Sequence, residues 1–209
     1  HLNVEFDSQE AGDQIISDLN LSVDEGESLG IIGPNGCGKT TLLHAIAGLH
    51  KNYRGKLTIN TAEDKVALIL QDIGLLPWKK KKKNATLGLD LGREGDKGDI
   101  EGILKELDLY EYRDNYPSQL SGGEKRKLGF ARALAVDPVI LLMDEPLVSL
   151  DEFTREKLQD KILQIWRERN LTMVLVTHDI EEVVFLGRKI AVLTSAPASL
   201  KTYIENPHM

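Results

Sequence analysis

Hydrophobic positions along the chain follow two alternating patterns. Short continuous apolar runs, typical of buried parallel strands, occupy residues 28–32, 66–70, 139–143 and 172–176. Apolar residues at helical spacing predict amphipathic helices over residues 39–48 and 151–169. Because strands alternate with helices, the pattern predicts an α/β fold with a mostly parallel sheet.

The pattern changes between residues 71 and 136. Ile100, Ile103, Leu104 and Leu107 recur at helical spacing, and a second helix is expected from about Gly122 onward. No convincing central strand occurs in this stretch. The sequence therefore predicts a helical insertion between two halves of the α/β core.

A glycine-rich stretch, GPNGCGKT at residues 33–40, lies between the first predicted strand and the first predicted helix. It matches G-x-x-x-x-G-K-[ST] in the context that this motif requires. Glycines let successive backbone N–H groups form an anion nest at the helix N-terminus, where Lys39 would reach the β- and γ-phosphates and Thr40 would ligate Mg²⁺. A tight turn without function is the alternative. The predicted nucleotide-binding loop comprises Gly33, Pro34, Asn35, Gly36, Cys37, Gly38, Lys39, Thr40 and Thr41.

Two adjacent acids end the third apolar run, in VILLMDEP at residues 139–146. Asp144 is expected at the carboxyl end of its strand, where an α/β sheet binds ligands, in position to hold Mg²⁺. Glu145 follows and is expected to polarise a water molecule for attack on the γ-phosphate, although metal ligation suits it equally. Taken alone, the segment could also be a strand followed by a solvated acidic turn.

The segment LSGGEKRK, residues 120–127, allows two readings. Ser121 followed by Glu124 fits a capping box, which indicates a helix start. Gly122 and Gly123, however, would each cost a helix interior about 1 kcal/mol relative to alanine, and a plain cap does not need them. Exposed amides at a helix start suit a phosphate, so both readings stay open at this point.

Composition narrows the class of protein. The chain has 209 residues, 41% of them hydrophobic, and a formal net charge of -7, which gives no global attraction to nucleic acid. One cysteine, Cys37, excludes an internal disulfide and favours a reducing, cytosolic setting. No apolar stretch approaches the length of a membrane span. We therefore expect a globular protein of one large domain without a nucleic-acid partner.

Together, the phosphate loop, LSGGE and the strand ending in DEP resemble the nucleotide-binding subunits of ATP-binding cassette (ABC) transporters, in their diagnostic order. The resemblance implies a P-loop NTPase core with a mostly parallel sheet, an amino-terminal antiparallel β portion and an inserted α-helical subdomain. It implies one ABC ATPase domain, with its core at residues 1–71 and 137–209 and its helical subdomain at residues 72–136. Two copies would pack head to tail, so that Ser121, Gly122 and Gly123 of one copy face Mg-ATP held by the other.

Further residues are assigned by the same resemblance. Gln71 matches the glutamine that contacts the metal and the attacking water, and His178 matches the histidine that contacts the γ-phosphate. Asp151, in SLD at residues 149–151, matches the loop that crosses the dimer interface; from sequence alone it is a helix N-cap. The family stacks adenine on an aromatic residue, but the aligned position here is Ser8.

The stretches QDIGLLPW (residues 71–78) and NATLGL (residues 84–89) resemble the nitrate, sulfonate and taurine importer group. This implies a chain on the cytoplasmic face of the membrane that works with a separate integral membrane permease and, indirectly, an extracytoplasmic substrate-binding protein. The permease would dock beside this segment. The lysine run at residues 79–83 is either a solvated helix turn or a site attracted to anionic lipid or to the membrane subunit.

Three rival functions remain. A soluble ABC ATPase acting on nucleic acid or ribosomes usually carries a long coiled coil, zinc cysteines or tandem cassettes, none of which occurs here. A phosphotransferase using the same loop would leave LSGGE and His178 without a role. A cassette that binds ATP without cleaving it is disfavoured by the presence of Glu145 and His178.

Overall fold

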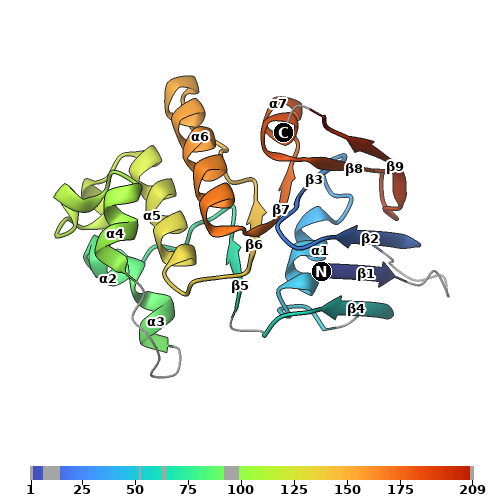
Figure 1. Cartoon of the computed structure of the whole chain (residues 1–209), viewed down its shortest axis with the longest axis horizontal. Helices are drawn as coiled ribbons and strands as arrows, with labels where there is room; N and C mark the ends of the chain where they lie inside the picture. Colours follow the sequence, from blue (N-terminus) through green and yellow to red (C-terminus); the bar gives the residue numbers. More distant parts are fainter. Residues whose placement is uncertain (1, 7–14, 52, 63–64, 92–98, 208–209) are drawn as a thin grey trace.

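Two sheets and a helical region make up the fold (Figure 1). The structure is a computed structural model that describes residues 2–6, 15–51, 53–62, 65–91 and 99–207. Helices α2 to α5 gather at one end of the molecule and the smaller sheet lies at the other. Among the described residues, none of the helices combines the length and apolar character needed to span a bilayer.

The larger sheet carries the predicted strands. Its order is β5 (Val66–Ile69), β6 (Ile140–Asp144), β7 (Thr172–Thr177), β3 (Ser28–Ile32), β8 (Lys189–Leu193) and β9 (Leu200–Glu205). All neighbours are parallel except β8 and β9, which are antiparallel. Strands β6 and β7 are buried at every position, which explains why their sequences are continuously apolar. The predicted mostly parallel sheet is confirmed.

The smaller sheet is antiparallel, with the order β2 (Leu19–Val23), β1 (Leu2–Phe6) and β4 (Gly55–Ile59). Along β2, buried Leu19, Leu21 and Val23 alternate with exposed residues, as expected for a strand with one face on a core. This sheet is the amino-terminal antiparallel portion that the family resemblance implies.

Helices cover both faces of the larger sheet. Helix α1 (Lys39–Ile46) lies between the two sheets and shares one apolar core with β2 and with one face of β6 and β7. Helix α6 (Glu152–Arg169) packs on the opposite face, where Leu141 and Met143 of β6 point. The short helix α7 (Ile180–Leu186) follows β7 and contacts β3 and β7. The large sheet is thus sandwiched between helical layers.

In the described part of the segment between β5 and β6, all the regular elements are helical. It contains α2 (Lys81–Ala85), α3 (Leu87–Leu91), α4 (Ile100–Glu106) and α5 (Gly122–Leu134), with 3-10 turns at Tyr110–Tyr112 and Pro117–Gln119. Leu104, Leu107 and Leu128 form part of its core and are fully buried. The helical insertion is confirmed, whereas the domain boundaries at residues 71–72 and 136–137 stay a prediction.

The lysine run is not uniformly solvated. Lys80 and Lys82 are exposed and pair with Asp114 and Glu101, but the Lys81 side chain is 0% exposed. Burial lowers the pKa of Lys81 below its ordinary value. The reading of the run as a solvated helix turn is therefore wrong at this position, because the side chain at residue 81 faces the interior of the helical region.

Candidate functional site

The glycine-rich loop joins β3 to α1 in a backbone conformation that depends on glycine. Gly36 and Gly38 have φ angles of +77° and +107°, in a region that side chains disfavour. A Cβ atom at Gly38 would lie 2.5 Å from Cγ2 of Ile15, whereas one at Gly36 would meet open space. Backbone conformation requires glycine at both positions, and close packing requires it at Gly38. The result is a loop whose amides lead into the N-terminus of α1.

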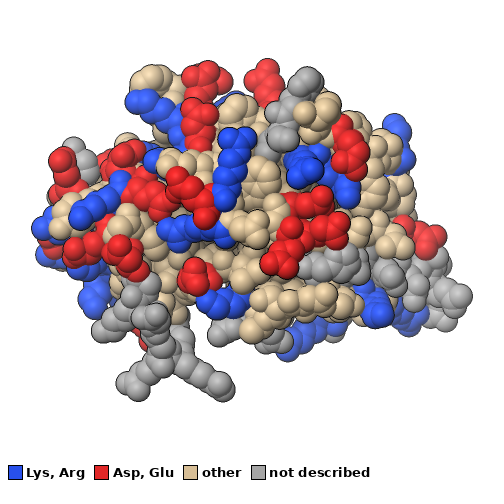
Figure 2. All heavy atoms as spheres, viewed as in Figure 1, with Lys and Arg blue, Asp and Glu red and all other residues tan. Residues whose placement is uncertain are grey.

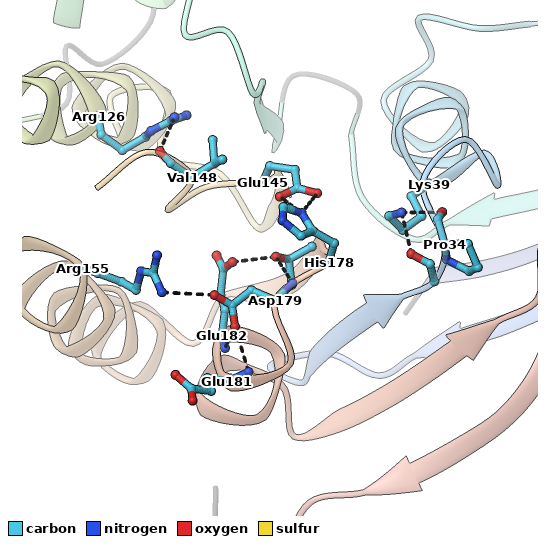
Figure 3. Close-up of polar contacts among 12 residues, drawn as sticks. Pro34, Lys39, Arg126, Glu145, Val148, Arg155, His178, Asp179, Glu181 and Glu182 are labelled. Carbon is cyan, nitrogen blue, oxygen red and sulfur yellow. Dashed lines mark hydrogen bonds and ion pairs between the residues drawn. The ribbon is translucent and has the colours of Figure 1, made fainter. Parts of the chain in front are cut away.

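Lys39 folds back over this loop. Its Nζ donates to the carbonyl oxygens of Gly33, at 2.8 Å, and Pro34, at 2.9 Å, and the residue is only 7% exposed (Figure 3). An ammonium group with three donors can exchange such carbonyl partners for phosphate oxygens without a change of burial. Cys37, in contrast, is buried in the core beneath the loop, as expected for a small filler.

Asp144 ends β6 beside the start of α1. It is 3% exposed and is hydrogen-bonded to Thr40. Burial raises the pKa of Asp144 and the neighbouring Glu145 adds to this effect, while the Thr40 hydrogen bond and the charges of His44 and Lys39 oppose it. A carboxylate and a hydroxyl in contact form a hard oxygen donor set, which is what Mg²⁺ prefers.

No group of three or more His, Cys, Asp or Glu side chains suited to a metal ion occurs in the described part of the chain. A divalent ion at Thr40 and Asp144 would therefore complete its coordination with other oxygen atoms, such as the Gln71 amide, water and phosphate. Magnesium commonly binds in this way, through one or two carboxylates plus substrate phosphates and water. The residues present fit Mg²⁺ on this ground.

Glu145 turns sharply away from the strand that precedes it. Its φ of +49° is left-handed, a conformation that costs a non-glycine residue about 1 kcal/mol, and its N–H donates to Val176 O at 2.8 Å. The turn aims the carboxylate at His178, whose Nδ1 lies 2.8 Å from Oε1 and 2.7 Å from Oε2 (Figure 3). The hydrogen bond and charge of Glu145 raise the pKa of His178.

A pocket of about 460 Å³ unites these groups. Most of its lining was expected from the sequence: Asn35, Gly36, Gly38, Lys39, Thr40, Thr41, Gln71, Asp144, Glu145 and His178. Ile15 also lines it and was missed, because no motif or spacing connects that residue to the loop. Ser8, the position aligned with the adenine-stacking aromatic residue, lies outside the described residues.

The other predicted residues do not line this pocket. Ser121 and Glu124 form the expected capping box, with the Ser121 N–H donating to Glu124 Oε2 at 2.8 Å and the Glu124 N–H to Ser121 Oγ at 3.2 Å. Asp151 is the N-cap of α6 and accepts from the Thr154 N–H at 3.0 Å. A Cβ at Gly123 would lie 2.6 Å from Thr154 Cγ2, but one at Gly122 would meet nothing within 4 Å. Packing within the chain thus explains why residue 123 is glycine, but it does not explain why residue 122 is.

A second set of polar groups, two of them buried and two partly buried, adjoins the pocket and was not anticipated. Thr177, at the end of β7, donates to Glu182 Oε2 at 2.6 Å. Arg155 of α6 pairs with Asp179 at 3.1 Å (Figure 3). Glu182 is 3% exposed, and burial raises its pKa to about 7. These contacts hold the backbone on both sides of His178.

Comparison with known proteins agrees with this geometry. A family model described as "ABC transporter" matches residues 16–148. The chain belongs to the ABC transporter family. The site accordingly makes it a nucleotide-binding cassette, an ATPase that binds ATP, built on the P-loop NTPase fold.

Relatives of this ABC cassette are similar along most of its length. The aliphatic sulfonates import ATP-binding protein SsuB of Bacillus licheniformis is 41% identical over 195 residues, which are 91% of this chain and 76% of that protein. Its namesake in Bacillus subtilis is 41% identical over 191 residues, covering 89% and 75%. An uncharacterized ABC transporter ATP-binding protein of Methanocaldococcus jannaschii, MJ0412, is 40% identical over 198 residues, covering 91% and 74%.

Solved structures share the same fold. Two dimeric structures of the ABC transporter cassette MJ0796, one of them a post-hydrolysis state bound to ADP and Pi, match this chain over the full length of both chains. Their TM-scores are 0.83 and 0.84, at 27% sequence identity.

Proposed function

We propose that this cassette is the ATP-hydrolysing subunit of an ABC importer, and that two copies enclose Mg-ATP head to tail. The observation that carries the proposal is that the predicted site residues fall into two groups, one that lines the pocket and one that does not. Lys39, Asp144, Glu145 and His178 line one pocket, whereas Ser121 does not line it. A second copy is needed to bring Ser121 to a nucleotide, because in one copy it lies outside the pocket.

Several polar residues of the pocket have a role in this proposal. The loop amides and Lys39 bind the β- and γ-phosphates, and Thr40, Asp144 and Gln71 hold Mg²⁺, which when bound neutralises charge on the phosphates. Glu145 orients a water molecule for in-line attack, since its carboxylate faces the pocket. His178 contacts the γ-phosphate and, through its pairing with Glu145, fixes the direction of that carboxylate. Thr41 supplies a further hydroxyl for a phosphate oxygen.

The lack of a packing reason for glycine at residue 122 supports the proposal that the N-terminus of α5 contacts a nucleotide held by the second copy. Its missing side chain serves no packing inside the chain, because a Cβ there would meet nothing within 4 Å. Glycine at the first position of α5 leaves the Gly122 and Gly123 amides open to an anion from outside, whereas the Ser121 N–H is already bonded to Glu124. Asp151, exposed as the N-cap of α6, lies near this surface, because Thr154, which it caps, contacts Gly123. The dimeric state of the related cassette structures agrees with this arrangement.

The proposed partners follow from the relatives and from the sequence resemblance. A separate integral membrane permease docks beside the segment at residues 71–89 on the cytoplasmic face, and an extracytoplasmic binding protein delivers the solute. Because relatives at 41% identity are named for aliphatic sulfonates, we propose a small solute of the sulfonate, taurine or nitrate type as the cargo. Over the face shown in Figure 2, acidic and basic side chains are interspersed, which does not favour nucleic acid or ribosomal RNA as the alternative partner.

Dilution tests the shared site. The ATPase rate per molecule is measured in saturating Mg-ATP while the protein is diluted over several orders of magnitude. If the site is assembled from two copies, the rate per molecule must fall once the protein concentration drops below the dimerisation threshold. A rate per molecule that stays constant on dilution contradicts the head-to-tail proposal.

Co-purification from the native membrane then identifies the permease and its binding protein, and stimulation of the reconstituted assembly by individual sulfonates identifies the cargo.

A further inference from the structure

Arg126 joins the helix that follows the Ser121 cap to two loops beside the nucleotide pocket. It lies in the second turn of α5 and is 6% exposed. Its Nη1 donates to the carbonyl oxygen of Gln71 at 3.0 Å, and its Nη2 donates to that of Val148 at 3.2 Å. Figure 3 shows the guanidinium reaching from the helix to Val148. One side chain thus contacts the loop that carries Gln71 and the loop that leads to Asp151.

The burial of this guanidinium has an energetic cost that its surroundings must offset. Desolvation lowers the pKa of Arg126, while the negative charges of Glu182 and Asp72 raise it. A planar guanidinium presents several N–H groups in a fixed fork, so it can serve two carbonyl oxygens from different segments at once. An ammonium group can also meet two carbonyl oxygens, as Lys39 does within one loop, but its single nitrogen and flexible stem do not set the spacing of two separate segments as a rigid fork does. The arrangement therefore depends on arginine and not only on a positive charge.

The same face of α5 holds more of the loop that carries Gln71. Positions 126, 129 and 132 are three residues apart and lie on one side of the helix. A Cβ at Gly129 would lie 2.7 Å from Ile73 Cγ2, so the helix and the loop are in close contact there. Arg132 donates to Gly74 O at 3.0 Å and also to Ile73 O. Residues 71–74 are consequently attached to α5 along two of its turns.

We propose that Arg126 is a positioning residue that makes Gln71, the loop at residues 148–151 and the N-terminus of α5 move as one unit. A displacement of α5 then carries the Gln71 backbone with it and shifts the loop before α6. ATP contact at Ser121 is thereby linked to the placement of Gln71 in the pocket. The inference rests on the proposed function, because Gln71 has a role only if the pocket hydrolyses ATP.

The first test separates turnover from nucleotide binding. Arg126→Ala is expected to lower kcat by roughly tenfold or more and to change KM for ATP by less than about threefold, since Arg126 does not line the pocket. Arg126→Lys is expected to lower kcat by several-fold as well. Lys127→Ala is the matched control on the same helix, because Lys127 pairs with Asp108 at 3.1 Å within the helical region. It is expected to keep the wild-type kcat.

The second test asks whether Arg126 acts through Gln71. Gln71→Ala and the double variant Arg126→Ala/Gln71→Ala are compared in the same assay, and the double variant is expected to lose little more kcat than Gln71→Ala alone. Independent, multiplying losses would overturn the proposal, and so would a wild-type kcat in Arg126→Ala or an effect on KM alone. If Arg126→Ala does not fold, a wild-type kcat in folded Arg126→Lys overturns it. An inactive wild-type protein would instead refute the proposed function.

Discussion

Nδ1 of His178 lies within 2.8 Å of both carboxylate oxygens of Glu145, although the two residues are 33 positions apart in the chain. Each follows the carboxyl end of its strand, β6 for Glu145 and β7 for His178, and these strands are parallel neighbours in the sheet. The pairing therefore depends on the sheet order and on the left-handed turn at Glu145. It holds the proposed base beside the pocket and raises the pKa of the histidine.

Glu145→Gln is expected to lower ATP turnover by about a hundredfold or more, the scale of a lost general base, while leaving ATP binding intact. The amide keeps the size of the carboxylate and can still hydrogen-bond to His178, but it cannot accept a proton from water. The ATP-bound dimer should therefore accumulate, and gel filtration in Mg-ATP measures it. Glu181→Gln, an exposed change on α7, is the matched control. A monomeric Glu145→Gln protein in excess Mg-ATP would count against the shared site.

Lys39→Ala is expected to abolish measurable nucleotide binding, because a charge-assisted contact to phosphate is lost. Titration calorimetry with ATP in the presence of Mg²⁺ measures the effect. Lys201→Ala, an exposed lysine on β9 that does not line the pocket, is the control. Since Lys39 also bonds to Gly33 O and Pro34 O, thermal unfolding must show that the variant is folded. Retained affinity in a folded Lys39→Ala protein would contradict the assignment.

Gly122 and Gly123 should respond differently to alanine. Gly122→Ala is expected to leave the free energy of unfolding unchanged or slightly raised, because the new methyl group meets open space and alanine favours helix by up to about 1 kcal/mol. It should nevertheless impair ATP-dependent dimerisation and turnover. Gly123→Ala is expected to lower stability, since its Cβ would lie 2.6 Å from Thr154 Cγ2.

Urea unfolding and ATPase assays on both variants provide the measurement. The informative outcome is a Gly122→Ala protein of undiminished stability that has lost turnover, because a role in folding alone cannot produce it. Full activity of Gly122→Ala would show that this amide surface does not contact nucleotide.

Glu182→Gln should change how stability depends on pH. Burial raises the pKa of Glu182 to about 7 in the folded protein, compared with an ordinary value of 4.5. Between these values the unfolded chain is ionised and the folded chain is protonated, so the free energy of unfolding falls as pH rises, and the effect levels off above about pH 7. Glutamine cannot ionise. The free energy of unfolding of the variant should therefore equal that of the wild type near pH 4.5 and exceed it by up to roughly 3 kcal/mol at pH 8.

Urea unfolding of both proteins across this pH range measures the difference. Glu181→Gln serves again as the control, because that residue is exposed on the same helix. Parallel pH profiles for wild type and Glu182→Gln would show that Glu182 is ionised when buried.

The sequence by itself determined the local parts of this protein. The strand before the glycine-rich loop, the helix after it and the Ser121–Glu124 capping box were predictable because their interactions join residues within a few positions of each other. The N-cap at Asp151 follows the same rule. The sequence also indicated Asp144 and Glu145, since an apolar strand that ends in two acids places them at the ligand-binding edge of a parallel sheet.

Only the tertiary structure decided which of these parts meet. The burial of Lys81, the entry of Ile15 into the pocket and the bonds from Arg126 to Gln71 and Val148 all depend on segments that are distant in the chain or meet only through packing. Periodicity records whether a residue faces a core, but it does not record which element supplies the other side of that core. Strand order and helix packing supply that information, and they arise from contacts summed over the whole chain.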